Sequence, residues 1–64
     1  MYQIGEIVEL KAFGMAYTTI GMVSNLSPLE CQLQGGAIYQ VKSATVRKLR
    51  TEIQEKFRKE FKVP

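Results

Sequence analysis

The stretch LECQLQGGAIYQVK, residues 29–42, predicts a β-hairpin, because two runs with apolar residues flank a pair of glycines. If Gly35 and Gly36 alone formed the loop, apolar Cys31 would face polar Gln40 across the strands. The inner face of the hairpin would then mix apolar and polar side chains. A loop with an odd number of residues removes this conflict, so we expect a loop of about three residues.

A three-residue loop gathers apolar side chains on one face of the hairpin. These side chains are Cys31, Leu33, Tyr39 and Val41, and the neighbouring register adds Ala37. One of the two glycines then takes the left-handed conformation that such loops need. In this arrangement Ile38 points outward.

Two further strands are expected upstream of the hairpin. In GEIVELKAF, residues 5–13, apolar and charged residues alternate as they do in a half-buried strand. The second strand is TTIGMVSNL, residues 18–26, which is rich in β-branched residues and is interrupted by Gly21. We expect a bulge or a tight bend at this glycine, and a turn at the Ser-Pro pair that follows the strand.

The C-terminal part of the chain predicts a turn, then a short segment that is either a strand or the start of a helix, and then a clear helix. SATV, residues 43–46, is typical of a turn, and VRKLR, residues 46–50, fits a last strand or the start of a helix. TEIQ marks the helix start more clearly. It fits a capping box in which the Thr51 hydroxyl accepts from the Gln54 backbone N–H while the Gln54 side chain reaches back. We therefore expect a helix over residues 51–62.

The predicted helix carries a narrow apolar stripe. Its members, here called the helix stripe, are Ile53, Phe57 and Phe61, at positions i, i+4 and i+8. So short a helix is marginal alone in water and needs a surface to dock on. The expected dock is the sheet of the same chain, where Ile7 or Ile38 requires cover, because so small a domain needs the contacts for its core. The alternative dock is another chain, through a homodimer or the capture of a partner protein.

The composition predicts one soluble, cytoplasmic domain over residues 1–64. Cys31 is the only cysteine, so no internal disulfide can form, and a core thiol in a reducing compartment is expected. The sequence contains neither His nor Asp, which leaves no base beside a nucleophile and no ligand set for zinc. We therefore expect no enzymatic activity, no small-molecule substrate, no cofactor and no metal. No stretch approaches the roughly 18 apolar residues that a membrane span requires, so no membrane segment is expected either.

The net charge of +3 is concentrated in residues 42–50. This segment, here called the basic segment, contains Lys42, Arg47, Lys48 and Arg50 and no acid. Cations so close in sequence could contact the phosphates of a nucleic acid, or they could keep an edge strand from pairing with another sheet. If the segment is a strand, Arg47 and Leu49 lie on one face and Lys48 and Arg50 on the other, so the four cannot share one surface.

Aromatic residues in the expected long loop after the first strand form a further candidate site. Phe13 and Tyr17 flank Gly14, where exposed rings could stack on bases or offer a groove to a peptide. In the alternative, aromatic rings close the open end of a barrel. We expect that role for Tyr39 and leave both roles open for Tyr17.

Five short strands with a long early loop, a tight later hairpin and a brief turn before the last strand resemble the SH3-like small barrel. The motif Gly5-x-Ile7-Val8, followed by Gly21-x-Val23, is similar to the opening of KOW-type modules, which bind RNA or proteins of transcription and translation. The resemblance implies a mainly β fold. It consists of a five-stranded antiparallel SH3-like barrel over about residues 3–50 and a C-terminal amphipathic α-helix.

The layout of a barrel and a C-terminal helix is also similar to that of small chromatin proteins of the Sul7 type, which lay a basic sheet on the DNA minor groove. The first four expected strands carry almost no base apart from Lys11 and Lys42. The DNA-binding residues of those proteins therefore cannot be carried over to this chain.

The expected function is that of a small non-enzymatic binding or adaptor module. One form of this prediction is nucleic-acid binding through the basic segment, aided by Tyr17. The alternative is protein interaction or regulation, as in accessory proteins of phages and mobile elements. That alternative would use the helix stripe or the loop with Phe13.

Overall fold

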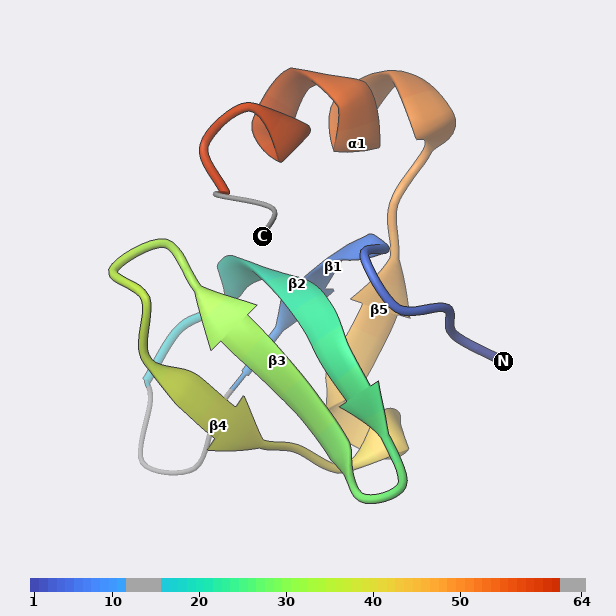
Figure 1. The fold of residues 1–64 in the computed structure, drawn as a ribbon, viewed down its shortest axis with the longest axis vertical. Helices are drawn as coiled ribbons and strands as arrows, with labels where there is room; N and C mark the ends of the chain where they lie inside the picture. Colours follow the sequence, from blue (N-terminus) through green and yellow to red (C-terminus); the bar gives the residue numbers. More distant parts are fainter. Residues whose placement is uncertain (12–15, 62–64) are drawn as a thin grey trace.

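Within residues 1–11 and 16–61, which the computed structural model describes, five strands form one antiparallel sheet (Figure 1). The strands are β1 (Ile7–Leu10), β2 (Thr19–Leu26), β3 (Leu29–Leu33), β4 (Ile38–Gln40) and β5 (Val46–Lys48). Their order across the sheet is β4-β3-β2-β1-β5. A 3-10 turn, η1 (Ser43–Thr45), precedes β5, and the helix α1 (Thr51–Arg58) follows it. The predicted mainly β fold with a C-terminal helix is confirmed.

The sheet is not closed into a hydrogen-bonded barrel, which corrects the prediction. Strands β4 and β5 lie at the two ends of the strand order, and no ladder joins them in the described part of the chain. Closure of a barrel requires staggered strands that are long enough to meet across the seam. β4 and β5 have three residues each, and η1 crosses between them instead.

The β3–β4 hairpin has the odd loop that side-chain polarity predicts. Cys31 is paired with Tyr39, and the Leu33 backbone N–H donates to the Ala37 carbonyl at 2.8 Å, which leaves three residues in the loop. Gly36 has a φ of +95°, the left-handed conformation expected of one glycine in this loop. The hairpin prediction is therefore confirmed in register and in turn geometry.

The irregularity in β2 lies away from Gly21, where we expected it. Gly21 is paired with Leu33 in the regular ladder, whereas the register shifts between Val23 and Asn25. A side chain at Gly21 would instead run into Leu10 of the neighbouring strand. The glycine thus permits close packing of two strands and does not produce a bulge.

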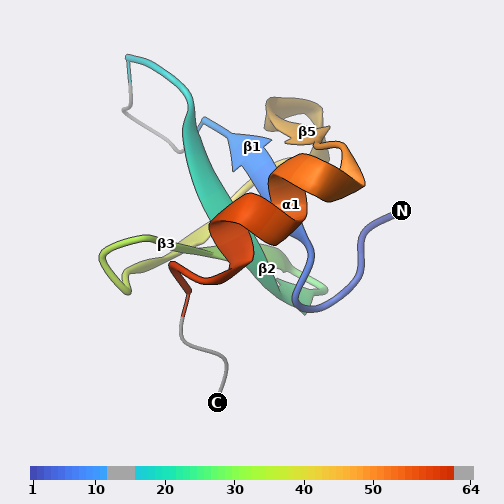
Figure 2. The same ribbon diagram turned by 90° about the horizontal axis from the view of Figure 1, so that it is seen from above.

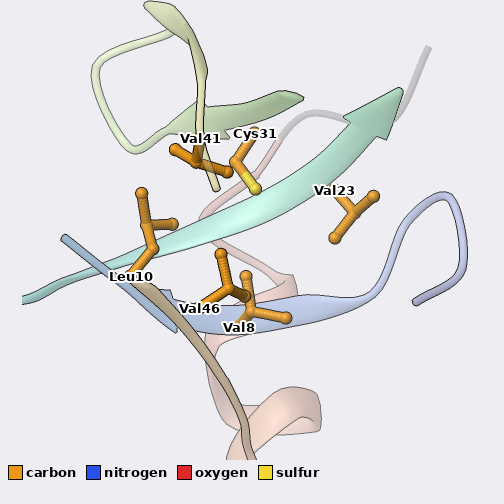
Figure 3. Packing of buried hydrophobic residues seen from close by; sticks show 6 residues of the cluster. All are labelled: Val8, Leu10, Val23, Cys31, Val41 and Val46. Atoms are coloured by element: carbon orange, nitrogen blue, oxygen red, sulfur yellow. The ribbon is translucent and has the colours of Figure 1, made fainter. Parts of the chain in front are cut away.

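One face of the sheet, here called the inner face, carries the larger core cluster. Its buried side chains are Val8, Leu10, Val23, Cys31, Val41 and Val46 (Figure 3). The partly buried side chains of Tyr2, Leu29 and Leu33 pack against this cluster. Burial raises the pKa of the Cys31 thiol to about 11, so the thiol is protonated and unreactive at neutral pH. The prediction of a core cysteine is confirmed.

The opposite face of the sheet, here called the helix face, is covered by α1 and the turn after it (Figure 2). Phe61 packs with Ile7 and Met22 in a second buried cluster, and Phe57 borders it. This bears out docking of the helix stripe on its own chain and cover for Ile7. The third member of the stripe, Ile53, remains 37% exposed.

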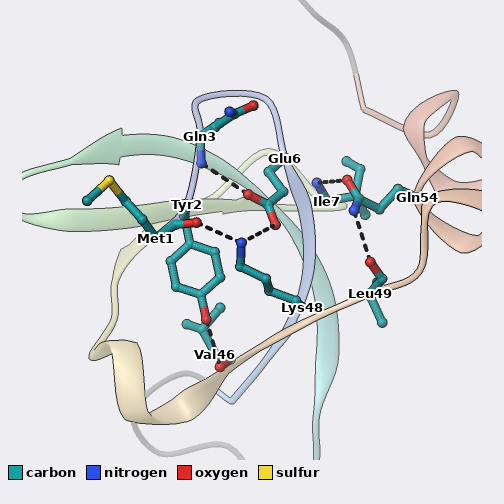
Figure 4. Close-up of polar contacts among 9 residues, drawn as sticks. All are labelled: Met1, Tyr2, Gln3, Glu6, Ile7, Val46, Lys48, Leu49 and Gln54. Carbon is teal, nitrogen blue, oxygen red and sulfur yellow. Dashed lines mark hydrogen bonds and ion pairs between the residues drawn. The ribbon is translucent and has the colours of Figure 1, made fainter.

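The helix start differs from the predicted capping box. Arg50 occupies the N-cap position without a side-chain cap, and Thr51 is already the first helical residue. Gln54 reaches across to the sheet, where its Oε1 accepts from the Ile7 backbone N–H at 3.3 Å and its Nε2 donates to the Leu49 carbonyl at 3.0 Å (Figure 4). The strand thus binds the side chain that was expected to cap the helix.

The helix also ends earlier than the predicted residue 62, at Arg58. The Phe61 backbone N–H donates to the Arg58 carbonyl at 3.2 Å, and the Glu60 N–H donates to the Phe57 carbonyl at 3.0 Å. These bonds span three residues, so the chain tightens into a turn. This turn places the Phe61 ring against Ile7 and Met22 of the sheet.

Replacement of Gln54 by alanine (Gln54→Ala) is expected to lower the free energy of unfolding by about 1–3 kcal/mol, because the Ile7 N–H loses its acceptor. Thr51→Ala is the control. It should change stability by less than ~0.5 kcal/mol, whereas loss of a true N-cap costs roughly 0.5–2 kcal/mol. Urea denaturation followed by circular dichroism measures both. A larger cost for Thr51→Ala than for Gln54→Ala would contradict the observed helix start.

Candidate binding surfaces

The basic segment does not form one cationic surface. Its central part is the strand β5, in which Arg47 lies opposite Glu9 and Lys48 lies opposite Val8 of β1. Neighbouring residues of a strand point to opposite faces. Arg47 therefore projects on the helix face and Lys48 on the rim of the inner face, as expected for a strand.

Lys48 is engaged with the N-terminal segment. Its Nζ donates to the Met1 carbonyl at 2.7 Å, lies 4.0 Å from a carboxylate oxygen of Glu6, and sits 5.3 Å from the centre of the Tyr2 ring (Figure 4). The Glu6 side chain is mostly buried. Lys48 therefore holds residues 1–6 against the edge of the sheet as well as adding charge to the surface.

Two cations of the basic segment form ion pairs within the described residues, and Arg47 is the more exposed of the two. Its guanidinium lies 3.8 Å from the Glu9 carboxylate, and its side chain is 81% exposed. So exposed a pair stabilises the fold little and leaves the guanidinium open to a ligand. Lys42 and Arg50 are also exposed, on the two sides of β5: Lys42 precedes η1 and Arg50 precedes α1.

An apolar groove lies at the end of the inner face where β2 turns into β3. It is lined by Met1, Tyr2, Leu26, Leu29 and Ser43 and has a volume of about 540 Å³. Small-molecule sites commonly have volumes of roughly 300–1,000 Å³. We call this surface the groove.

The walls of the groove are fixed by the core. The Tyr2 hydroxyl donates to the Val46 carbonyl at 3.1 Å, and the Tyr2 and Leu29 side chains pack on the inner cluster. Leu26 and Leu29 form the last pair of the β2–β3 ladder, on the two sides of the Ser-Pro turn. Leu26 is 47% exposed and Met1 is fully exposed, so the groove presents apolar surface to solvent.

Two cations are close to lining residues of the groove, one by a contact and one by its place in the sequence. Lys42 precedes the lining residue Ser43, and Lys48 lies over the Tyr2 ring. The acid seen beside them is Glu6, which is paired with Lys48. Glu30 adjoins the lining residue Leu29 in the sequence, so the charge that is seen to contact a groove residue, in the described part of the chain, is Lys48 over the Tyr2 ring.

Sequence reasoning missed the groove. Its lining comes from the N-terminal segment, the β2–β3 turn and η1, which the fold brings together from three parts of the chain. The signal in the sequence is the pair of leucines at 26 and 29, which leaves apolar residues on both sides of a turn. Turns at the surface are usually polar, so this pair is unusual.

The remaining candidate residues that the structure describes do not line the groove. Tyr17 is exposed, and Phe13 falls outside the described residues. Tyr39 is 43% exposed and does not close an end of the sheet, which corrects the expected role. Phe57 and Phe61 are used within the fold, so the helix stripe offers a partner little beyond Ile53.

Comparison with family models, with curated proteins and with solved structures finds no match for this chain. In the described residues, no helix has the length and apolar character needed to cross a bilayer.

Proposed function

We propose that the chain is a small non-enzymatic binding module of SH3-like architecture, and that the groove takes an apolar side chain of a partner protein. The strand order β4-β3-β2-β1-β5, the long connection after β1 and the 3-10 turn before β5 support the SH3-like assignment. The exposed apolar groove carries the functional part of the proposal. Fold similarity alone does not define a ligand.

The chemistry of the groove defines the partner segment. Burial of one large aliphatic or aromatic side chain contributes roughly 1.5–3 kcal/mol, and Leu26 would lose its own exposed surface at the same time. Lys48, which lies over the Tyr2 ring, favours carboxylates beside this anchor. The preferred partner is thus a protein segment with one large apolar residue flanked by acidic residues.

An NMR titration of isotope-labelled protein with two synthetic peptides tests the proposal. The peptides are Glu-Glu-Phe-Glu-Glu and Lys-Lys-Phe-Lys-Lys, each blocked at both ends. We expect the acidic peptide alone to shift the amide signals of Tyr2, Leu26, Leu29 and Ser43, with a weak affinity on the order of 0.1–1 mM for so small an anchor.

A variant pair controls this experiment. Leu26→Glu places a charge at the mouth of the groove and should abolish the shifts, whereas Tyr17→Glu adds the same charge on another exposed hydrophobic residue and should leave them intact. The proposal fails if both peptides leave the groove signals unchanged, or if Leu26→Glu binds the acidic peptide as well as the unaltered protein does.

The charge of the basic segment favours nucleic acid as a second candidate ligand. Arg47 and Arg50 are exposed, and residues 42–50 contain no acid.

Fluorescence anisotropy with duplex DNA, single-stranded DNA and RNA at several salt concentrations tests nucleic-acid binding. Each phosphate contact should add about 0.9 to the salt slope on duplex DNA. The double variant Arg47→Gln/Arg50→Gln should reduce the magnitude of that slope by about 1.8, the contribution of two phosphate contacts. Lys59→Gln should leave the slope unchanged. Binding that ignores salt excludes this candidate.

A further inference from the structure

The outer edge of β4 is a second candidate binding surface, at the far end of the sheet from β5. In the described residues β4 pairs with β3 on one side and with no strand on the other. Ile38 is 60% exposed and Tyr39 is 43% exposed, on opposite faces of the strand. An exposed apolar edge strand is a template for pairing with another chain.

The backbone of this edge offers a short ladder of groups that have no hydrogen-bond partner within the described residues. The Leu33 N–H donates to the Ala37 carbonyl and the Val41 N–H donates to the Leu29 carbonyl, so residues 37 and 41 face β3. Because facing directions alternate along an antiparallel strand, residue 39 also faces β3. The N–H and carbonyl groups of Ile38 and Gln40 therefore point away from the sheet.

The two edges of the sheet differ in charge. Residues 31–41 contain no charged side chain, so two copies of β4 can approach without repulsion. At the other edge, β5 exposes Arg47 and Lys48, and such cations on an edge strand oppose pairing. We propose that β4 pairs antiparallel with β4 of a second copy of this chain, which gives a two-fold symmetric dimer with one sheet running through both subunits.

The direction of the free backbone groups fixes the register of this pairing. Ile38 exchanges hydrogen bonds with Gln40 of the partner subunit, and Gln40 exchanges them with the partner subunit's Ile38, which makes about four bonds in all. Tyr39 then lies on the two-fold axis, opposite the partner subunit's Tyr39. The contact is isologous, so it closes at two subunits and does not propagate.

Sedimentation equilibrium from about 10 µM to about 1 mM tests the dimer, because a short edge pairing belongs to the small, weak class of interfaces. We expect a mass that rises from one to two subunits. Ile38→Lys puts a cation on the edge and should give a monomer throughout, whereas Tyr17→Lys, a matched change at another exposed hydrophobic residue, should keep the dimer.

Disulfide trapping tests the register. In a Cys31→Ala background, which removes the thiol opposite residue 39 in the same subunit, Tyr39→Cys should form an intersubunit disulfide under mild oxidation, because directly opposed residues of a non-hydrogen-bonded pair have Cα atoms about 4.5 Å apart. Ile38→Cys should form far less, since the two copies of residue 38 are diagonal neighbours roughly 7–8 Å apart. A monomer at about 1 mM, a dimer unaffected by Ile38→Lys, faster trapping at 38 than at 39, or assembly beyond two subunits overturns the proposal.

Discussion

Replacement of Phe61 by alanine is expected to lower the free energy of unfolding by about 3–5 kcal/mol. The Phe61 ring is 5% exposed and packs with Ile7 and Met22, so its loss leaves a cavity between the helix face and the turn after α1. A chain of 64 residues has a total stability of roughly 3–10 kcal/mol. The variant should therefore be close to unfolding in water, as urea denaturation will measure.

Ile53→Ala is the matched control for this prediction. Ile53 belongs to the same helix stripe but is 37% exposed, so its truncation should cost less than about 1 kcal/mol. If the two variants lose similar stability, Phe61 does not dock as described. If Phe61→Ala is as stable as the unaltered protein, the second cluster does not contribute to the fold.

The second large effect is expected at the contact between β1 and β2. A Cβ at Gly21 would lie 2.5 Å from Cδ2 of Leu10 and 3.2 Å from the Gln32 carbonyl oxygen, and Leu10 is fully buried. Gly21→Ala should therefore cost about 1–3 kcal/mol through overpacking, and Leu10→Ala about 2–5 kcal/mol through a cavity.

A double-mutant cycle gives this prediction its sharpest form. In the variant with both changes, the new methyl group at Gly21 enters the space that the Leu10 side chain has left. The combined loss in the free energy of unfolding should then be smaller than the sum of the single losses by about 0.5–3 kcal/mol. Additive losses would show that Gly21 is required for some reason other than contact with Leu10.

The strand pattern and the hairpin could be predicted because they depend on side-chain alternation. The parity of apolar residues around Cys31 and Tyr39 admits only an odd loop, and the structure has one. The predicted capping box was wrong because the sequence does not show which partner the Gln54 side chain binds. Gln54 can bond its own helix or the Ile7 N–H, and only the tertiary structure decides between them.

The candidate site was less accessible to prediction than the fold. A cluster of cations in sequence becomes two separate surfaces once the pleat of β5 turns Arg47 and Lys48 apart. The groove depends on Tyr2 and Leu29, which are 27 positions apart and meet only when the N-terminal segment folds onto the sheet. Closure of the barrel was also overestimated, because strand length at the two edges could not be judged from composition.

The contact between Ile7 and Phe61 joins β1 to the turn after α1, and these lie near opposite ends of the described residues. During synthesis, β1 leaves the ribosome long before Phe61 does, and its helix face then has no cover. The second apolar layer is therefore completed last, because it needs a side chain from the turn after α1. A chain truncated before residue 61 should be more sensitive to proteases than the unaltered chain, because Ile7 and Met22 then lack this cover.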